Sequence, residues 1–157
     1  MKADDPTLGD VLRRSMVARI ATLSRNGRPS ITPLYFVCVN GQIWLGTVDW
    51  TLAARDVKAD PRVSVLFEVG QNPHDHRIVR ITGRANLRTD RKAQRSYVLR
   101  VAFKYSLTPG QIRNSLAHIG QLLLRRHYHA QSAEKGQSCV IVVTPEQAEF
   151  LNDNQSG

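Results

Sequence analysis

Two Asn-Gly pairs, Asn26-Gly27 and Asn40-Gly41, constrain this chain most, because each lies between runs of β-forming residues. Asn-Gly tolerates the positive φ angles of a tight hairpin turn, so the chain is expected to reverse at both places. The flanking runs are Met16–Ser24, Pro29–Val39 and Gln42–Thr47, all rich in apolar and β-branched residues. The sequence therefore predicts three antiparallel strands joined as a meander by two tight turns.

The middle strand carries Pro33, which has no N–H to give to a sheet and so marks a bulge, a bend or an unpaired edge. After the third strand, Leu52–Ala59 has a helical composition, with Thr51 placed to cap its start. Asp60-Pro61 ends this helix, because the residue before proline is pushed out of the helical region. The apolar run Arg62–Val69 is then a fourth strand.

The remainder predicts two more strands and further helices. Arg77–Leu87 alternates between a basic outer face and an apolar inner face, and its Gly83 suggests a bulge. Ser138–Val143 is a sixth strand, after which Ala148–Gly157 is expected to fray. The predicted helices are Thr7–Arg14, Thr89 to about Ser106, and Thr108 to about His127. The last two form a helical insertion, about 89–129, between strands five and six.

Six antiparallel strands without a βαβ alternation predict a mainly β fold, a β-barrel with flanking helices. Residues 1–157 suit one such domain. No apolar run is long enough to span a bilayer, and the acidic start Met1–Pro6 is unlike a secretory signal. We therefore expect a cytoplasmic protein with no membrane contact.

The charge balance is the unusual feature of the composition. The 22 basic and 13 acidic residues give a net charge of +9, which favours an anionic partner. The charges are spread along the chain rather than gathered in a tail, so nucleic acid is an unlikely partner. Arg80 and Arg84, on one face of the fifth strand, are equally consistent with a phosphate or acidic-tail site and with a solvated basic face.

Metal and thiol chemistry are not indicated. His74-Asp75-His76 lies in a polar loop, and His127-Tyr128-His129 follows two arginines that oppose a cation, so we expect no metal site. Cys38 and Cys139 are too far apart for a CxxC pattern and are expected to be buried, reduced thiols. The phosphate loops and the GxSxG elbow are also missing, so a cofactor would carry any redox chemistry.

Four segments in order resemble the pyridoxamine 5'-phosphate oxidase-like split-barrel family of flavin- and deazaflavin-binding oxidoreductases, which includes small enzymes that use coenzyme F-420. They are ATLSRNGRPSITP, GQIWLGT, ADPRVSVLFE and VRITGRA, between Val17 and Gly83. The resemblance implies a six-stranded split barrel, a homodimer, and a cofactor bound between the two protomers. The C-terminal substrate segment of the true pyridoxamine phosphate oxidases is not recognisable, so that particular activity is not expected.

The resemblance also implies where the cofactor binds. Its phosphate would lie at Thr47, Thr51, Arg55 and the start of the Leu52–Ala59 helix. Its ring would lie near Pro33 and Tyr35, and an acidic tail would use Arg80. The family pattern has basic residues where this chain has Leu52 and Ala53. At other cofactor-binding positions, Thr32 and Val37 stand where the family has an Arg and a Lys, and Ile78 stands where it has a glutamine.

Two functions follow from these residues. The first is an oxidoreductase that transfers hydride between coenzyme F-420, or FMN, and a small organic substrate. The alternative is a split-barrel binding protein without redox activity, which holds haem or another anionic small molecule. Leu52, Ala53, Val37 and Ile78 favour the alternative, because a phosphate held without a basic side chain loses its charge-assisted bonds. No catalytic residue is assigned.

Overall fold

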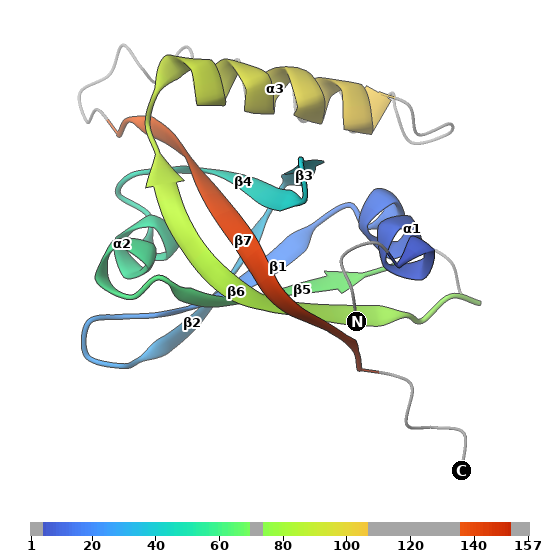
Figure 1. Cartoon of the computed structure of the whole chain (residues 1–157). Coiled ribbons are helices and arrows are strands. Elements are labelled where there is room, and N and C mark those ends of the chain that lie inside the picture. The colour runs from blue at the N-terminus through green and yellow to red at the C-terminus, as the bar shows by residue number, and fades with distance from the viewer. Residues whose placement is uncertain (1–4, 70–73, 107–135, 152–157) are drawn as a thin grey trace.

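The computed structural model describes residues 5–69, 74–106 and 136–151, which form one curled antiparallel sheet with three helices around it (Figure 1). The sheet has seven strands in the order β2-β1-β5-β6-β7-β4-β3. The strands are β1 (Ala18–Leu23), β2 (Pro29–Leu34), β3 (Phe36–Val39), β4 (Gln42–Val48), β5 (Arg62–Glu68), β6 (Ile78–Arg88) and β7 (Ser138–Phe150); the helices are α1 (Pro6–Arg14), α2 (Leu52–Ala59) and α3 (Arg91–Ser106).

The number of strands differs from the six predicted, because the run Pro29–Val39 breaks at Tyr35 into β2 and β3. β2 pairs with β1, whereas β3 pairs with β4, so the predicted three-stranded meander becomes two separate hairpins. β2 and β3 stand at opposite ends of the sheet order although a single residue separates them in the chain. The sheet must therefore curl until its two ends come near each other, which makes a split barrel.

The predicted turns and edge are confirmed. Gly27, Asn40 and Gly41 have φ angles of 74°, 50° and 75°, as tight hairpins require. Pro33 lies on β2, an end strand of the sheet, which is one of the positions that its missing N–H predicts.

The long pair β6 and β7 holds the two halves of the sheet together. β7 continues through Pro145 to Phe150, beyond the predicted end at Val143, because the first residues of β6 offer partners: Ile81 lies opposite Ala148 and Val79 opposite Phe150. The expected fraying from Ala148 is therefore wrong up to Phe150. The predicted bulge at Gly83 is confirmed by a register shift there, and a Cβ at Gly83 would lie 2.2 Å from the Thr144 carbonyl oxygen.

Apolar side chains form two cores. The first fills the barrel and includes Ile20, Phe36, Leu45, Val65 and Ile141. The second lies between the outer face of β3, β4 and β7 and the helix α3 and is built around Val37, Trp44, Val101, Tyr105 and Val142. The alternation of side chains along β3 explains this division, because Phe36 points into the barrel and Val37 points toward α3.

Side chains cap the first two helices, and the predicted cap at Thr51 is confirmed. Asp5 accepts a hydrogen bond from the Thr7 N–H at the start of α1, and Thr51 accepts one from the Ala54 N–H at the start of α2. α3 follows β6 across the top of the sheet in Figure 1. The second predicted helix of the insertion, Thr108 to about His127, lies outside the described residues. Of the helices described, none is long and apolar enough to cross a membrane.

Candidate functional site

The connection from β4 to α2 is built around two threonine hydroxyls. Thr47, at the end of β4, is 3 % exposed, and its Oγ1 lies 2.8 Å from Oγ1 of Thr51. Thr51 Oγ1 donates to the carbonyl oxygen of Val48 at 2.9 Å and accepts from the Ala54 N–H at 3.3 Å. Because a hydroxyl has one proton, Thr47 is the donor in the bond to Thr51. Both hydroxyl protons thus serve to fix the start of α2.

The connection from β4 to α2 is also hydrogen-bonded to the residue that precedes β7. The Asp49 N–H donates to the Gln137 carbonyl oxygen at 3.0 Å, and the Gln137 N–H donates to Asp49 Oδ1 at 3.1 Å. The ring of Trp50 covers Gly136, where a Cβ would lie 2.2 Å from Trp50 Cδ1. These contacts hold the first turn of α2 in place relative to the sheet.

Asp56 fixes the other side of α2. It is 5 % exposed, and its Oδ2 accepts hydrogen bonds from the hydroxyls of Thr22 and Ser30, each at 2.8 Å. These bonds join α2 to β1 and β2. Asp56 is not among the predicted site residues; the available signal was a lone carboxylate in a helical segment between the apolar residues Ala53 and Val57.

The start of α2 offers an anion two kinds of donor. The first N–H groups of a helix have no partner within it, and the Leu52 N–H makes no hydrogen bond to another described residue while Leu52 is 60 % exposed. Arg55 is exposed and lies four residues after Thr51, on the same helix face, with no carboxylate partner among the described residues. Ala53 is fully buried and faces the protein.

These donors fit a phosphate group at the helix start. One guanidinium and the positive end of the α2 dipole favour a dianion there. The site has fewer charged side chains than the family pattern, because Leu52 and Ala53 stand at its two basic positions. Leu52 is exposed and Ala53 is buried.

Tyr35 comes close to this connection, at the break between β2 and β3. Its carbonyl oxygen accepts hydrogen bonds from the Gly46 N–H at 3.4 Å and from the Tyr97 hydroxyl at 3.0 Å. Gly46 precedes Thr47, so the structure brings Tyr35 next to the strand end that carries Thr47. On β2, Thr32 is half-buried and Pro33 is exposed, so these two neighbours point to opposite faces.

Arg80 lies apart from the other predicted site residues within one chain. Its guanidinium forms an ion pair with Glu149 of β7. Thr47 lies opposite Cys139 of the same strand and Arg80 opposite Glu149. Ten residues of β7 therefore separate the two positions, a path of about 33 Å at the usual rise of a strand.

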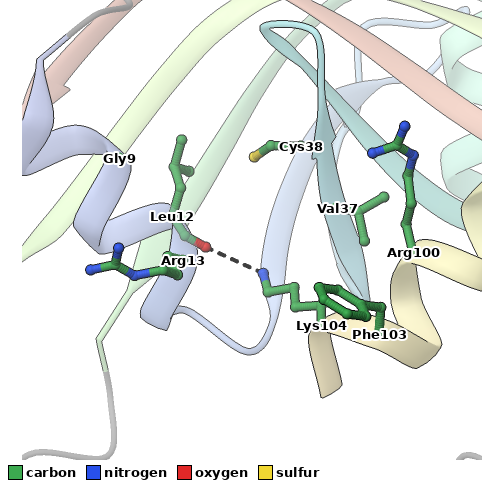
Figure 2. A pocket seen from close by; sticks show the side chains of 8 residues that line it. All are labelled: Gly9, Leu12, Arg13, Val37, Cys38, Arg100, Phe103 and Lys104. Carbon is green, nitrogen blue, oxygen red and sulfur yellow. Dashed lines mark hydrogen bonds between the residues drawn. The ribbon is translucent and has the colours of Figure 1, made fainter. Parts of the chain in front are cut away.

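Cys38 departs from its prediction, because it is exposed whereas Cys139 is buried as predicted. Cys38 is on the same face of β3 as Phe36, but it is exposed whereas Phe36 is buried. Its thiol lines a cavity together with Lys104 of α3 (Figure 2). Desolvation by the surrounding protein raises the pKa of the Cys38 thiol, and the positive charge of Lys104 lowers it by a smaller amount.

The histidine pairs do not form a metal centre in the part of the chain that the structure describes. His74 and His76 are both exposed, and the carboxylate of Asp75 between them is bound by Arg77 and Arg14 at 2.7 and 2.9 Å. No group of three metal-ligating side chains occurs among the residues described. His127 and His129 lie outside these residues.

A curled antiparallel sheet with a capped helix after its fourth strand defines a split-barrel protein. A family model described as pyridoxamine 5'-phosphate oxidase matches residues 5–152. The chain therefore belongs to this family, as the sequence segments predicted. Among curated proteins, none matches this chain.

Solved structures with the same fold have diverse descriptions. A conserved hypothetical protein of Mycobacterium tuberculosis aligns with a TM-score of 0.69 and 19% identity, over 94% of this chain and 83% of that one. A protein described as an F420 reductase aligns at 0.61 and 18%, over 89% and 94%. HutZ, a haem storage protein of Vibrio cholerae, aligns at 0.59 and 14%, over 95% and 94%. These TM-scores establish a shared fold, and identities this low leave function to the residues of this chain.

Proposed function

We propose that this protein is a homodimeric oxidoreductase that binds coenzyme F-420 or FMN with its phosphate at the start of α2. The observation that carries the proposal is the Thr47–Thr51 hydroxyl pair, 2.8 Å apart, which fixes the start of α2. This helix start bears the Leu52 N–H, which has no partner among the described residues, and the Arg55 guanidinium. Family membership over residues 5–152 supports it. The same proposal places the protein in the cytoplasm.

In this proposal the chain binds and orients, and a bound deazaflavin or flavin would supply a ring able to accept or donate hydride. Arg55 and the Leu52 N–H would hold the phosphate, while Thr47 and Thr51 keep the helix start rigid. The face near Pro33 and Tyr35 would position the ring. Arg80 is paired with Glu149 and distant within the chain, so in this proposal it meets a cofactor tail only across a dimer.

The dimer is proposed because apolar side chains are exposed on both sides of the α2 cap. Trp50, before Thr51, is 67 % exposed, and Leu52, after it, is 60 % exposed. Exposed apolar groups that lie near one another are typical of protein interfaces. Light scattering of the purified protein should give the mass of two chains, whereas a monomer at micromolar concentration would contradict this part of the proposal.

The cofactor proposal is tested by titrating the purified protein with coenzyme F-420 and with FMN while fluorescence is followed. Binding of one of them at micromolar concentration is the expected result. Arg55→Ala should then weaken affinity about tenfold or more, because a charge-assisted bond to phosphate is lost. Lys58→Ala removes the same charge from the far end of α2 and should have little effect. Equal losses in the two variants would assign the effect to net charge rather than to the phosphate site.

A gain of affinity gives an independent test. Leu52 is exposed, so Leu52→Arg should fold, and it restores a guanidinium where the family pattern has a basic residue. This variant should bind FMN about tenfold more tightly than the parent. Unchanged affinity would place the phosphate elsewhere.

The second candidate function is a binding protein without redox activity, which holds haem or another anionic small molecule. It is favoured by Ala53, whose full burial leaves no room for the longer basic side chain of the family pattern. Haem titration followed by the Soret band distinguishes the two candidates. Haem binding together with no binding of either flavin-type cofactor would replace the first proposal with the second.

A further inference from the structure

A cavity of about 320 Å³ lies between α1, β3 and α3, at the end of the barrel away from α2 (Figures 1 and 2). Its wall is mostly apolar and includes Leu12, Val37 and Phe103. The size is at the lower end of the range for small-molecule sites. Phe103 is 69 % exposed, so the cavity is open to solvent on the side of α3.

The charged groups at this cavity all have the same sign. Arg13, Arg100 and Lys104 line it, and no acidic side chain does. Arg13 is already paired, since its Nη2 lies 2.6 Å from Asp10 Oδ1. Among the described residues, the Arg100 side chain donates only to the Ser96 hydroxyl, at 3.4 Å, and neither Arg100 nor Lys104 forms an ion pair with a carboxylate. Two positive charges therefore face one apolar cavity without compensation.

Lys104 is held at the cavity wall by neutral groups. Its Nζ donates to the Leu12 carbonyl oxygen at 3.2 Å and lies 3.4 Å from the centre of the Phe36 ring. Burial lowers the pKa of Lys104 to about 8. An ammonium has three donors, and one is used by Leu12. An anion in the cavity would offer an acceptor to the others and offset the loss of hydration.

We propose that this cavity binds a small organic monoanion, a carboxylate carried on an aromatic or aliphatic body. The carboxylate would meet Lys104 and Arg100, and the body would pack against Leu12, Val37 and Phe103. A monoanion suits the site better than a phosphate dianion, because the wall is mostly apolar and a second charge would lose hydration without a further partner. The site is independent of the proposed cofactor site, since Thr47 and Thr51 are at the other end of the barrel.

The test uses 1-naphthoate and its neutral isostere 1-naphthamide, titrated into the purified protein by calorimetry. Naphthoate should bind, and naphthamide should bind about tenfold or more weakly, because it lacks the charge-assisted bonds. Naphthoate should also slow alkylation of Cys38 by N-ethylmaleimide, read by mass spectrometry, since Cys38 lines the cavity. This readout requires neither F-420 nor FMN, so its outcome does not depend on whether the cofactor proposal is correct.

Variants on α3 locate the effect. Lys104→Met should weaken naphthoate binding about tenfold. Lys92→Met removes the same charge from an exposed position of the same helix and should leave affinity unchanged. If Lys104→Met does not fold, Arg100→Leu, at an exposed position, should still weaken binding severalfold. Equal affinities for the acid and the amide, no binding at about 1 mM, or an unchanged affinity in folded Lys104→Met would each overturn the proposal.

Discussion

The hydroxyl of Tyr97 in α3 donates a hydrogen bond to the carbonyl oxygen of Tyr35, 3.0 Å away, at the point where β2 gives way to β3. The Tyr97 ring also lies directly over Gly46 of β4, where a Cβ would be 2.3 Å from Tyr97 Cε1. One side chain of α3 therefore covers the strand that leads into Thr47 and holds the bend that closes the barrel. The placement of α3 and the geometry of the predicted cofactor region depend on each other.

Gly46→Ala should lower the free energy of unfolding by about 1–3 kcal/mol, because the added methyl group forces the Tyr97 ring out of its place. Urea denaturation gives this value. Tyr97→Phe should cost only about 1 kcal/mol, the usual contribution of one hydrogen bond. In a Tyr97→Ala background, Gly46→Ala should cost much less than in the parent. An equal cost in both backgrounds would mean that Tyr97 is not what excludes a side chain at position 46.

Asp56→Ala should destabilise the protein by about 3 kcal/mol, because one buried and one half-buried hydroxyl lose a charged acceptor. Thr22 Oγ1 and Ser30 Oγ lie 2.9 Å apart, so in this variant one hydroxyl can donate to the other, and the second is left without the acceptor that Asp56 supplied. Asp56→Asn keeps one oxygen acceptor and should cost less. Thermal unfolding of the three proteins, parent included, checks the order; equal stability of the alanine and asparagine variants would contradict it.

Local features of this fold could be predicted from the sequence, because nearby residues determine them. The Asn-Gly turns, the bounds of α2 at Leu52 and Ala59, and the bulge at Gly83 all depend on residues within a few positions. The break at Tyr35 could not be predicted in this way. It occurs because the first half of the strand pairs with β1 and the second half with β4, and that choice depends on how the whole sheet curls.

The same distinction applies to the candidate site. Thr47 and Thr51 are four residues apart, and the family pattern predicted that they act together at the helix start. Lys104 meets Cys38 and Leu12 only because α3 and α1 approach β3 in the folded chain, and no local pattern encodes this meeting. The distance between Arg80 and Thr47 could not be predicted from the sequence for the same reason, since the register of β7 determines it.

Asp75 should contribute stability that is lost only in strong acid. Bidentate hydrogen bonds from Arg77, supported by Arg14, lower the pKa of Asp75 to about 2, from an ordinary value of 3.8. A lowered carboxyl pKa means that the unfolded state binds more protons in this window, so the contribution is complete above pH 3.8 and disappears as the pH falls through about 2.

Asp75→Asn is therefore expected to be less stable than the parent at neutral pH, and the two proteins should converge as the pH approaches 2. Urea midpoints measured between neutral and acid pH provide the comparison. Glu146→Gln, at an exposed position of β7, is the matched control and should differ from the parent equally at every pH. A stability difference for Asp75→Asn that does not change with pH would show that the ion pair with Arg77 is not formed.

Lys104 should make the protein more stable as the pH rises from 8 toward 10.5. Desolvation lowers the pKa of Lys104 from 10.5 to about 8 in the folded state, so between these values the unfolded chain holds a proton that the folded chain has released. Below pH 8 both states are protonated and the cost of the buried charge is complete.

Lys104→Met has no such cost, so its stability relative to the parent should fall by about 1–3 kcal/mol between pH 7 and pH 10. Denaturant unfolding at the two pH values measures the difference, and Lys92→Met should show no such change. A constant difference for Lys104→Met would mean that Lys104 keeps its ordinary pKa and that its ammonium is hydrated rather than packed against Phe36.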